Sequence, residues 1–381
     1  MPSYDVVVVG LGAMGSAAAS ALAARGLRVL GIEQFTPAHD LGSSHGDSRI
    51  IRQAYFEHPS YVPLLQEAYR LWEELEVRSG TRLLTLTGGL LLGSPDAGTV
   101  TGSRRSAAQW DLPHEMLDAA TIRERFGTFA PDDDVVGLYE ERAGFVVPEA
   151  TVTAQLDLAR RDGADLRFEE RVTGWESTRA GVRVSTEAES YEAGHVVLSP
   201  GAWAPRLLDL DVPLRVERQI MHWYTPAGGA ERFSAARHPV YVWEEGSGDQ
   251  VYGFPAREGE GLVKVAFFRR RQLTDPDHVD RVVHPHEIDE MTEWLSHRIP
   301  ALTRHERAAT CLYTVTPDHH FVVGTHPAHA NVTVAAGFSG HGFKFTPVIG
   351  RIVADLATGV DPGHELGLFD PARSALAASP R

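Results

Sequence analysis

Cysteine, long apolar runs and basic residues are all scarce in this chain, and each scarcity excludes a class of protein. The 381 residues contain one cysteine, Cys311, so no disulfide can form within the chain, and a reducing cytoplasm is the expected location. No apolar run approaches the roughly 20 residues that span a membrane, and no basic segment with an apolar core marks a signal peptide. Basic residues are outnumbered by acidic ones, 36 to 51, and the net charge of −15 argues against a nucleic-acid partner.

What remains is the composition of an ordinary globular protein. The apolar fraction is 43% and the charged fraction is 23%. A chain of 381 residues is long enough for two domains that each bury a core.

The first apolar run leads directly into a glycine motif. Tyr4 to Val9 is typical of a parallel strand that is buried on both faces. In the motif that follows, Gly10 permits a tight turn, Gly12 lets backbone N–H groups approach a pyrophosphate, and Gly15 lets the next helix pack closely. Glu33 ends the second strand, where it can bind the hydroxyls of an adenosine ribose. This context predicts dinucleotide binding but does not distinguish FAD from NAD.

The remaining sequence alternates between buried parallel-strand patterns and antiparallel patterns. We therefore predict an α/β fold, with a Rossmann-like dinucleotide-binding domain and an antiparallel-sheet substrate domain with flanking helices. The expected boundaries are 1–84, 146–214 and 316–381 for the first domain, and 85–145 and 215–315 for the second. The expected elements are helices over 13–25, 61–76, 119–126, 148–163 and 348–358, strands over 4–9, 27–32, 166–172, 195–199 and 332–336, and antiparallel strands within 215–270.

Three further segments contain residues suited to chemistry. Gly337 to Gly342 follow a buried strand, where a glycine-rich loop can lie against a flat ring or a phosphate, and Lys344 adds a cation; an ordinary loop is the alternative. Arg49 and Arg52 lie three residues apart, on one helix face or a compact loop, and could bind a carboxylate or form a solvated basic turn.

The third segment is Thr310-Cys-Leu-Tyr-Thr-Val-Thr-Pro-Asp318. Together with a dinucleotide fold, a cysteine beside Tyr313 suggests a flavin enzyme that holds its flavin by a thioether. The alternative is that Cys311 is a small buried hydrophobe, as most lone cysteines are.

Taken together, these segments resemble the monomeric sarcosine oxidase and N-methyltryptophan oxidase family, within the D-amino-acid-oxidase-like flavoproteins. The resemblance covers essentially the whole chain. It rests on Gly10 to Gly15, His45-Gly-Asp-Ser-Arg-Ile-Ile-Arg52, Tyr252-Gly-Phe-Pro followed by Lys264, Thr310 to Asp318, and Gly337 to Lys344.

The resemblance implies FAD bound covalently through its 8α-methyl carbon to Cys311. It also implies that a secondary (N-methyl or cyclic) amino acid loses a hydride to flavin N5, that the imine hydrolyses, and that O2 is reduced to H2O2. The partners are then a small amine or amino acid and O2, and the protein is a monomer. No metal is required, because the flavin carries out the redox step.

The same resemblance assigns roles to individual residues. Lys264 is expected to promote the reaction with O2, where a fixed cation stabilises superoxide. Arg49 is expected beside the flavin ring, with Tyr313 and Tyr252 lining the pocket. Arg52 and Lys344 are expected to bind the substrate carboxylate. Residues assigned to the cofactor are Gly10, Gly12, Gly15, Glu33, Ser44, His45, Ser48, Val172, Gly201, Trp203, Cys311, Gly337, Gly340, Gly342 and Lys344.

One residue departs from the family pattern. The sarcosine-type enzymes carry a histidine four residues after the lysine, and this chain has Phe268 there. We therefore expect either a more apolar pocket, which accepts larger apolar side chains better than N-methylglycine, or amine binding by other means. Trp223, Tyr224 and Trp243 either line the same space or belong to the core.

Other functions stay open at this point. An NAD-linked dehydrogenase could use the same glycine motif, and a flavin-binding subunit could require a partner chain for turnover. The substrate could also be another amine or a primary amino acid, and the sequence does not name it.

Overall fold

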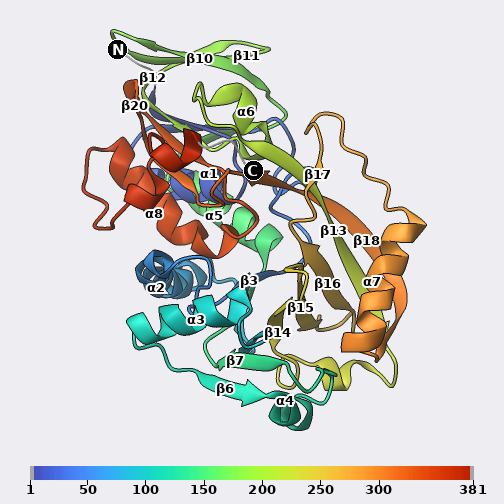
Figure 1. Cartoon of the computed structure of the whole chain (residues 1–381). Helices are drawn as coiled ribbons and strands as arrows, with labels where there is room; N and C mark the ends of the chain where they lie inside the picture. Colours follow the sequence, from blue (N-terminus) through green and yellow to red (C-terminus); the bar gives the residue numbers. More distant parts are fainter. Residues whose placement is uncertain (1–3, 378–381) are drawn as a thin grey trace.

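The computed structural model describes residues 4–377 and contains a parallel sheet and a large antiparallel sheet, each flanked by helices (Figure 1). The predicted α/β fold class is confirmed. Within residues 4–377, no helix is long and apolar enough to cross a membrane.

The first sheet has a parallel core in the order β20-β12-β1-β2-β9, to which β19 and the β10–β11 hairpin add antiparallel strands. Both faces of β1 are buried: Val6 and Val8 pack on one side, and Val7 and Val9 on the other. This two-sided burial explains the continuous apolar run. The strands are β1 (Tyr4–Val9), β2 (Val29–Ile32), β9 (Asp165–Arg167), β10 (Val172–Thr178), β11 (Gly181–Thr186), β12 (Ser190–Leu198), β19 (Val322–His326) and β20 (His329–Ala336).

Helices α1 (Ala13–Ala23), α5 (Pro148–Arg161) and α8 (Thr346–Ala357) pack together beside this sheet (Figure 1). Small residues allow the close approach. A Cβ on Gly15 would lie 1.7 Å from the carbonyl oxygen of Gly10, and a Cβ on Gly350 would lie 2.4 Å from Cβ of Ala17. Small residues in α1 are therefore required for the helix to pack closely against the glycine turn and against α8.

The second sheet runs β17-β13-β16-β15-β14-β5-β7-β6, and β18 also pairs with β13. Its pairs are antiparallel except for β14 with β5, which are parallel. The strands are β5 (Gly89–Gly93), β6 (Glu115–Asp118), β7 (Val136–Glu140), β13 (Arg215–Pro226), β14 (Val240–Glu244), β15 (Gln250–Ala256), β16 (Val263–Phe268), β17 (Gln272–Leu273) and β18 (Leu302–Val315).

A small third sheet has the order β3-β8-β4 and is built from β3 (Arg49–Ile51), β4 (Leu84–Leu86) and β8 (Gly144–Val146). The other helices are α2 (Val62–Ser79), α3 (Gly98–Gln109), α4 (Ala119–Arg125), α6 (Ala204–Leu207) and α7 (Pro285–Arg298), with 3₁₀ turns η1 (Pro59–Tyr61), η2 (Gly201–Trp203), η3 (Ala230–Phe233), η4 (Phe343–Phe345), η5 (Gly367–Phe369) and η6 (Ser374–Ala377). The first two sheets draw their strands from discontinuous segments; the domain boundaries themselves stay a prediction.

Two local predictions were wrong. Residues 166–172 do not form one strand: β9 ends at Arg167, Glu169 adopts a left-handed φ of 58°, and β10 begins at Val172. Arg49 and Arg52 lie neither on a helix nor on a compact loop. Arg49 begins β3, which pairs with β8, and Arg52 directly follows that strand.

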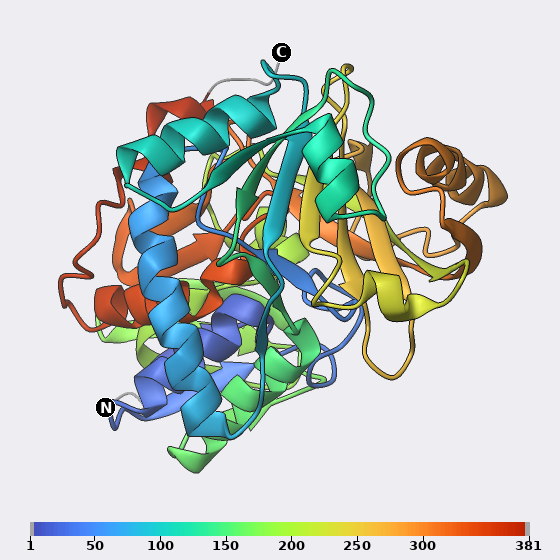
Figure 2. The same cartoon turned by 90° about the horizontal axis from the view of Figure 1, so that it is seen from below.

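Helices α3 and α7 had no counterpart in the sequence analysis. Helix α7 carries a recognisable signal, a capping box of His284 and Glu287 with Pro285 in the first turn. Helix α3 does not, because glycine, threonine and serine are poor helix formers. It lies across the lower part of the molecule in Figure 1 and beside the second sheet in Figure 2.

Tertiary contacts therefore hold α3. Glu244 of β14 accepts hydrogen bonds from the backbone N–H groups of Gly98 and Thr99 at the helix start. On the buried face, Ser103 donates to the carbonyl oxygen of Ala54 and Ser106 to that of Tyr55. The helix thus braces the segment that follows Arg52.

Glycine at position 102 sets the distance between α3 and that segment, because a Cβ there would lie 2.5 Å from the carbonyl oxygen of Phe56. We expect Gly102→Ala to lower the free energy of unfolding by about 1–3 kcal/mol, as overpacked cores do. The matched control is Gly98→Ala on the same helix, whose Cβ would meet its nearest neighbour at 3.5 Å. Urea unfolding of the two variants checks this; equal midpoints would contradict the role of the close approach.

Candidate functional site

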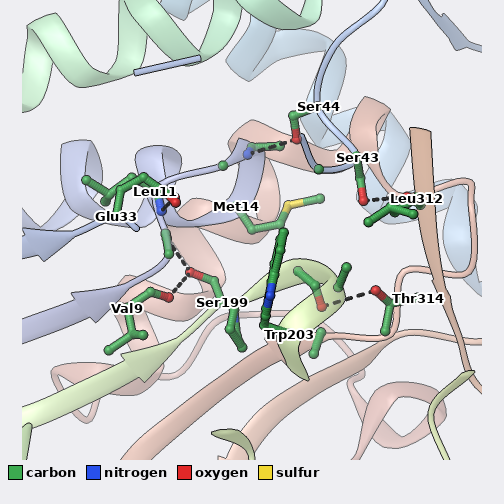
Figure 3. A pocket seen from close by; sticks show the side chains of 18 of the residues that line it. Val9, Leu11, Met14, Glu33, Ser43, Ser44, Ser199, Trp203, Leu312 and Thr314 are labelled. Carbon is green, nitrogen blue, oxygen red and sulfur yellow. Dashed lines mark hydrogen bonds between the residues drawn. The ribbon is translucent and has the colours of Figure 1, made fainter. Parts of the chain in front are cut away.

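A cavity of about 410 Å³, which we call the main cavity, lies beyond the carboxyl ends of β1, β2, β12 and β20. This is where ligands bind in open α/β sheets. Figure 3 shows Met14 and Trp203 pointing toward one another between the glycine turn and the residues that follow Cys311. Predicted cofactor residues that line the cavity are Gly10, Gly12, Glu33, Ser44, Val172, Gly201, Trp203, Gly337, Gly340 and Gly342.

The glycine turn fits a bound dinucleotide. Gly10 has a left-handed φ of 83°, and a Cβ there would lie 2.5 Å from the carbonyl oxygen of Ser199. A Cβ on Gly12 would have its nearest neighbour, Oγ of Ser44, at 3.6 Å, so that position is open. Ser199 donates to the carbonyl oxygens of Val9 and Gly10 and fixes the turn from below (Figure 3).

Glu33 stands at the end of β2, as predicted. Its carboxylate accepts hydrogen bonds from the backbone N–H groups of Leu11, at 2.8 Å, and Phe35, at 3.1 Å. Figure 3 shows Glu33 beside Leu11. Burial raises its pKa, and these backbone hydrogen bonds oppose that effect. An acceptor is therefore held at the place where an adenosine ribose would need one.

Other predicted cofactor residues do not line the main cavity: Gly15, His45, Ser48, Cys311 and Lys344. Gly15 lies beneath the turn. Burial, with nearby Arg49 and Lys264, lowers the pKa of His45 to about 3, so its ring is neutral. Among residues 4–377 its buried Nε2 atom has no hydrogen-bond partner, an orphaned polar atom that a bound group could satisfy.

Buried Lys264 and Cys311 lie close to Arg49, which lines the main cavity. Lys264 donates from Nζ to the carbonyl oxygens of Gly46, at 2.5 Å, and Ser48, at 2.8 Å. Burial and the charge of Arg49 lower the pKa of Lys264 well below its usual value. Lys264 does not line the main cavity. Its expected place near the flavin came only from the family resemblance.

Cys311 is 1% exposed and lies on β18. Burial raises the pKa of its thiol, and Arg49 and Lys264 oppose that rise. Alternate residues of a strand share a face, so Cys311 points to the same side of β18 as Tyr313, which lines the main cavity. The burial of Cys311 fits a small hydrophobic core residue, and its place beside Tyr313 also fits an attachment point next to the cavity.

A second, smaller cavity of about 60 Å³ adjoins the first. Arg49, Tyr313, Gly340 and Phe343 line both. The small cavity brings together the predicted substrate residues Arg52, Tyr252, Phe268 and Lys344 with Ile50, Phe56, Glu57, Val242 and His341. Residues more than 290 positions apart in the sequence therefore meet in one pocket.

Phe268 lines the small cavity. Its ring meets those of Tyr252 and Tyr313 edge-on, with centroid distances of 6.3 and 5.9 Å. Trp223, Tyr224 and Trp243 do not line the pocket; each is at most 1% exposed and belongs to the core.

Glu57 is a site residue that the sequence analysis missed. It accepts a hydrogen bond from Arg52 at 2.7 Å. Burial alone would raise the pKa of its carboxyl, but Arg52, His341 and Lys344 lower it to about 2. Nothing in the local sequence separates Glu57 from other acidic residues, since its partners come from the fold.

Glu140 is a second missed residue. Its buried carboxylate accepts hydrogen bonds, both at 2.7 Å, from the backbone N–H groups of Gln53 and Ala54. Glu140 thus binds backbone N–H groups of the segment after Arg52, and the serines of α3 bind its carbonyl oxygens. Its place at the end of β7 gives no sequence signal for this function.

The fold and the main cavity define a dinucleotide-binding oxidoreductase. The FAD dependent oxidoreductase family matches residues 5–356, and the chain belongs to that family. Monomeric sarcosine oxidase of Streptomyces avermitilis is 57% identical over 100% of this chain and 99% of its own. N-methyl-L-tryptophan oxidase of Salmonella agona is 35% identical over 96% and 98%. The family resemblance found in the sequence is confirmed.

Solved structures agree in fold. NikD, described as an unusual amino acid oxidase essential for nikkomycin biosynthesis, superposes with a TM-score of 0.84 at 29% identity, covering 97% of this chain and 98% of its own. Glycine oxidase from Geobacillus kaustophilus, at 22% identity, has a TM-score of 0.81 and covers 98% of this chain and 99% of its own. The second likeness shows the fold alone.

Proposed function

We propose that this protein is a FAD-dependent oxidase of N-methyl or cyclic secondary amino acids, with O2 as the electron acceptor and H2O2 as a product. The observation that carries the proposal is the small cavity, which joins the main cavity at Arg49 and Tyr313 and presents two cations, Arg52 and Lys344. The sarcosine oxidase and N-methyltryptophan oxidase relatives support the substrate class.

The cofactor supplies the redox chemistry when bound: it accepts a hydride equivalent from the substrate and passes the electrons to O2. The residues proposed to hold it are the turn of Gly10, Gly12 and Gly15, the carboxylate of Glu33, and the loop from Gly337 to Gly342. His45 and Ser48 contribute near Arg49, and Cys311 is proposed as the covalent attachment point.

The chain's own residues bind and orient the substrate. Arg52 and Lys344 attract its carboxylate, and charge-assisted hydrogen bonds to both fix how the amino acid lies in the pocket. Tyr252, Tyr313 and Phe268 line the small cavity around the rest of the substrate and exclude water from it. Arg52 must share its charge with Glu57, which limits how strongly it binds an anion.

Lys264 is proposed to act on the oxygen reaction by electrostatics. Its Nζ atom donates to the carbonyl oxygens of Gly46 and Ser48 and lies 3.5 Å from the hydroxyl oxygen of Ser48. A cation fixed in a dry environment stabilises a developing superoxide more than one in water would.

The NAD-linked alternative has no support from the family, which is FAD dependent. The division into two domains with the boundaries given above, the monomeric state and a cytoplasmic location are parts of the proposal. The name of the 57% identical relative supports the monomer, and the single cysteine is compatible with a reducing compartment.

The substrate class is tested by peroxide formation with a panel of amines and amino acids. Because Phe268 presents an apolar ring, we expect N-methylated or cyclic amino acids with larger apolar side chains to exceed sarcosine roughly tenfold in kcat/KM. Phe268→His should shift the ratio back toward sarcosine. A wild-type preference for sarcosine, or an equal effect of the substitution on both substrates, would contradict this role of Phe268; no peroxide from any amine would refute the oxidase.

The covalent link is tested by denaturation. If Cys311 carries the flavin, precipitated wild-type protein stays yellow. Cys311→Ala and Cys311→Ser should release the colour to the supernatant, because neither side chain can form a thioether. Flavin that washes out of denatured wild type would show that Cys311 is simply a buried apolar residue.

The role of Lys264 is tested by separating the two half-reactions. We expect Lys264→Met to leave anaerobic flavin reduction within about an order of magnitude and to slow reoxidation by O2 at least roughly a hundredfold. The control is Arg307→Met, which removes a half-exposed cation 4.1 Å from the Trp223 ring on the same sheet. Stopped-flow spectroscopy measures both rates; equal slowing of both in Lys264→Met would assign it a structural role.

A further inference from the structure

The tyrosine three residues after Arg52 contacts both cations of the small cavity. Tyr55 is 0% exposed. Its ring centroid lies 4.2 Å from Cζ of Arg52 and 5.1 Å from Nζ of Lys344. Its hydroxyl oxygen also lies 3.3 Å from that Nζ atom. One buried side chain therefore packs against both ends of the proposed carboxylate site.

The hydroxyl of Tyr55 has a fixed direction. His341 Nε2 lies 2.9 Å from the carbonyl oxygen of His319, which can only accept, so Nε2 carries the proton. Burial holds the pKa of His341 well below its usual value, so the ring is neutral and Nδ1 is an acceptor. Tyr55 therefore donates its proton to Nδ1, at 2.6 Å, in preference to the more distant carbonyl oxygen of His341, at 3.3 Å, and its oxygen can accept from Lys344.

The donors of Lys344 can now be counted. Its ammonium group has three N–H bonds. One points to the carbonyl oxygen of His341, at 2.7 Å, and one to the hydroxyl oxygen of Tyr55. The third is left for a ligand in the small cavity, which Lys344 lines.

The backbone of Tyr55 is held as firmly as its side chain. Ser106 of α3 donates to its carbonyl oxygen, and Glu140 accepts from the two residues before it. The backbone of Tyr55 is thus held by the second sheet and α3, whereas His341 of the glycine loop orients its hydroxyl.

We propose that Tyr55 and His341 are positioning residues that hold Lys344 and Arg52 at a fixed separation, with one N–H of Lys344 aimed at a substrate carboxylate. The proposal rests on the proposed function and deepens it: the pair of cations is built as a receptor for a single carboxylate. Neither residue takes part in the chemical step.

The charge state of Lys344 gives the proposal a pH dependence. Burial, with Arg52 and Arg269, lowers its pKa to about 7, whereas Glu57 opposes that fall. Lys344 Nζ also contacts the Tyr55 hydroxyl and the backbone carbonyl oxygen of His341. Because only the ammonium form attracts an anion, carboxylate binding is present below this pKa and is lost as pH rises through it.

Tyr55→Phe keeps the ring against both cations but removes the acceptor from Lys344. The ammonium form loses a hydrogen bond, so its pKa falls further and carboxylate binding is lost at lower pH. The matched control is Tyr61→Phe: this buried neighbour, with its ring 4.8 Å from that of Tyr55, donates to or accepts from His320 and does not contact Lys344.

The experiment is calorimetric titration of the flavin-loaded protein with acetate across the neutral pH range, which requires no turnover. We expect Tyr55→Phe to weaken acetate at least roughly tenfold, the size of one lost charge-assisted hydrogen bond, and to move the loss of binding to lower pH. Tyr61→Phe should match wild type in both. In turnover, Tyr55→Phe should raise KM for amino acids while an amine without a carboxylate is oxidised as by wild type.

An unchanged affinity and pH midpoint in Tyr55→Phe would overturn the proposal, as would an equal change in Tyr61→Phe or a wild type that does not bind acetate. If Tyr55→Phe does not fold, His341→Leu decides, because it frees the Tyr55 hydroxyl to rotate and should also weaken acetate; unchanged binding there overturns the proposal. Acetate binding without peroxide formation from any amine would instead refute the proposed oxidase and leave the receptor standing.

Discussion

Burial of positive charge is the constraint on which this site depends. Arg52, Lys264 and Lys344 are each at most 6% exposed, and a buried cation is costly unless polar groups replace its water. The fold meets this requirement differently for each. Arg52 pairs with Glu57, Lys264 donates to backbone carbonyl oxygens, and Lys344 donates to a carbonyl oxygen and a hydroxyl. The unused N–H groups then determine where an anion can bind.

The segment from His45 to Glu57 links the two cavities physically. Its first part surrounds Lys264 beside the main cavity, β3 carries Arg49 between the cavities, and Arg52 opens the small one. This stretch has little regular structure of its own, so its geometry comes from neighbours. Glu140 and α3 hold its backbone, and a buried backbone N–H or C=O group without such partners would destabilise the fold.

Binding of the cofactor and of the substrate therefore depend on different parts of the molecule. The parallel sheet provides the turn at Gly10 and the carboxylate of Glu33, whereas the antiparallel sheet provides Tyr252, Phe268 and Tyr313. Tyr313 and Arg49 line both cavities, so the proposed cofactor and substrate sites adjoin at these two residues.

The sequence by itself determined the α/β class, the dinucleotide turn and the family. The glycines of the turn and the buried parallel strand before them both leave patterns in the local sequence. Motif resemblance also pointed to Arg52, Lys344 and Phe268, which the fold brings into one cavity. The tertiary structure alone decided which acidic groups meet this segment: Glu57 pairs with Arg52 and Glu140 holds the backbone after it, and neither bears a local mark. Helix α3 forms against its own weak propensity for the same reason, since its stability comes from Glu244 and from the backbone it braces. Local patterns encode backbone geometry, whereas the pairing of buried charges depends on residues that only folding brings together.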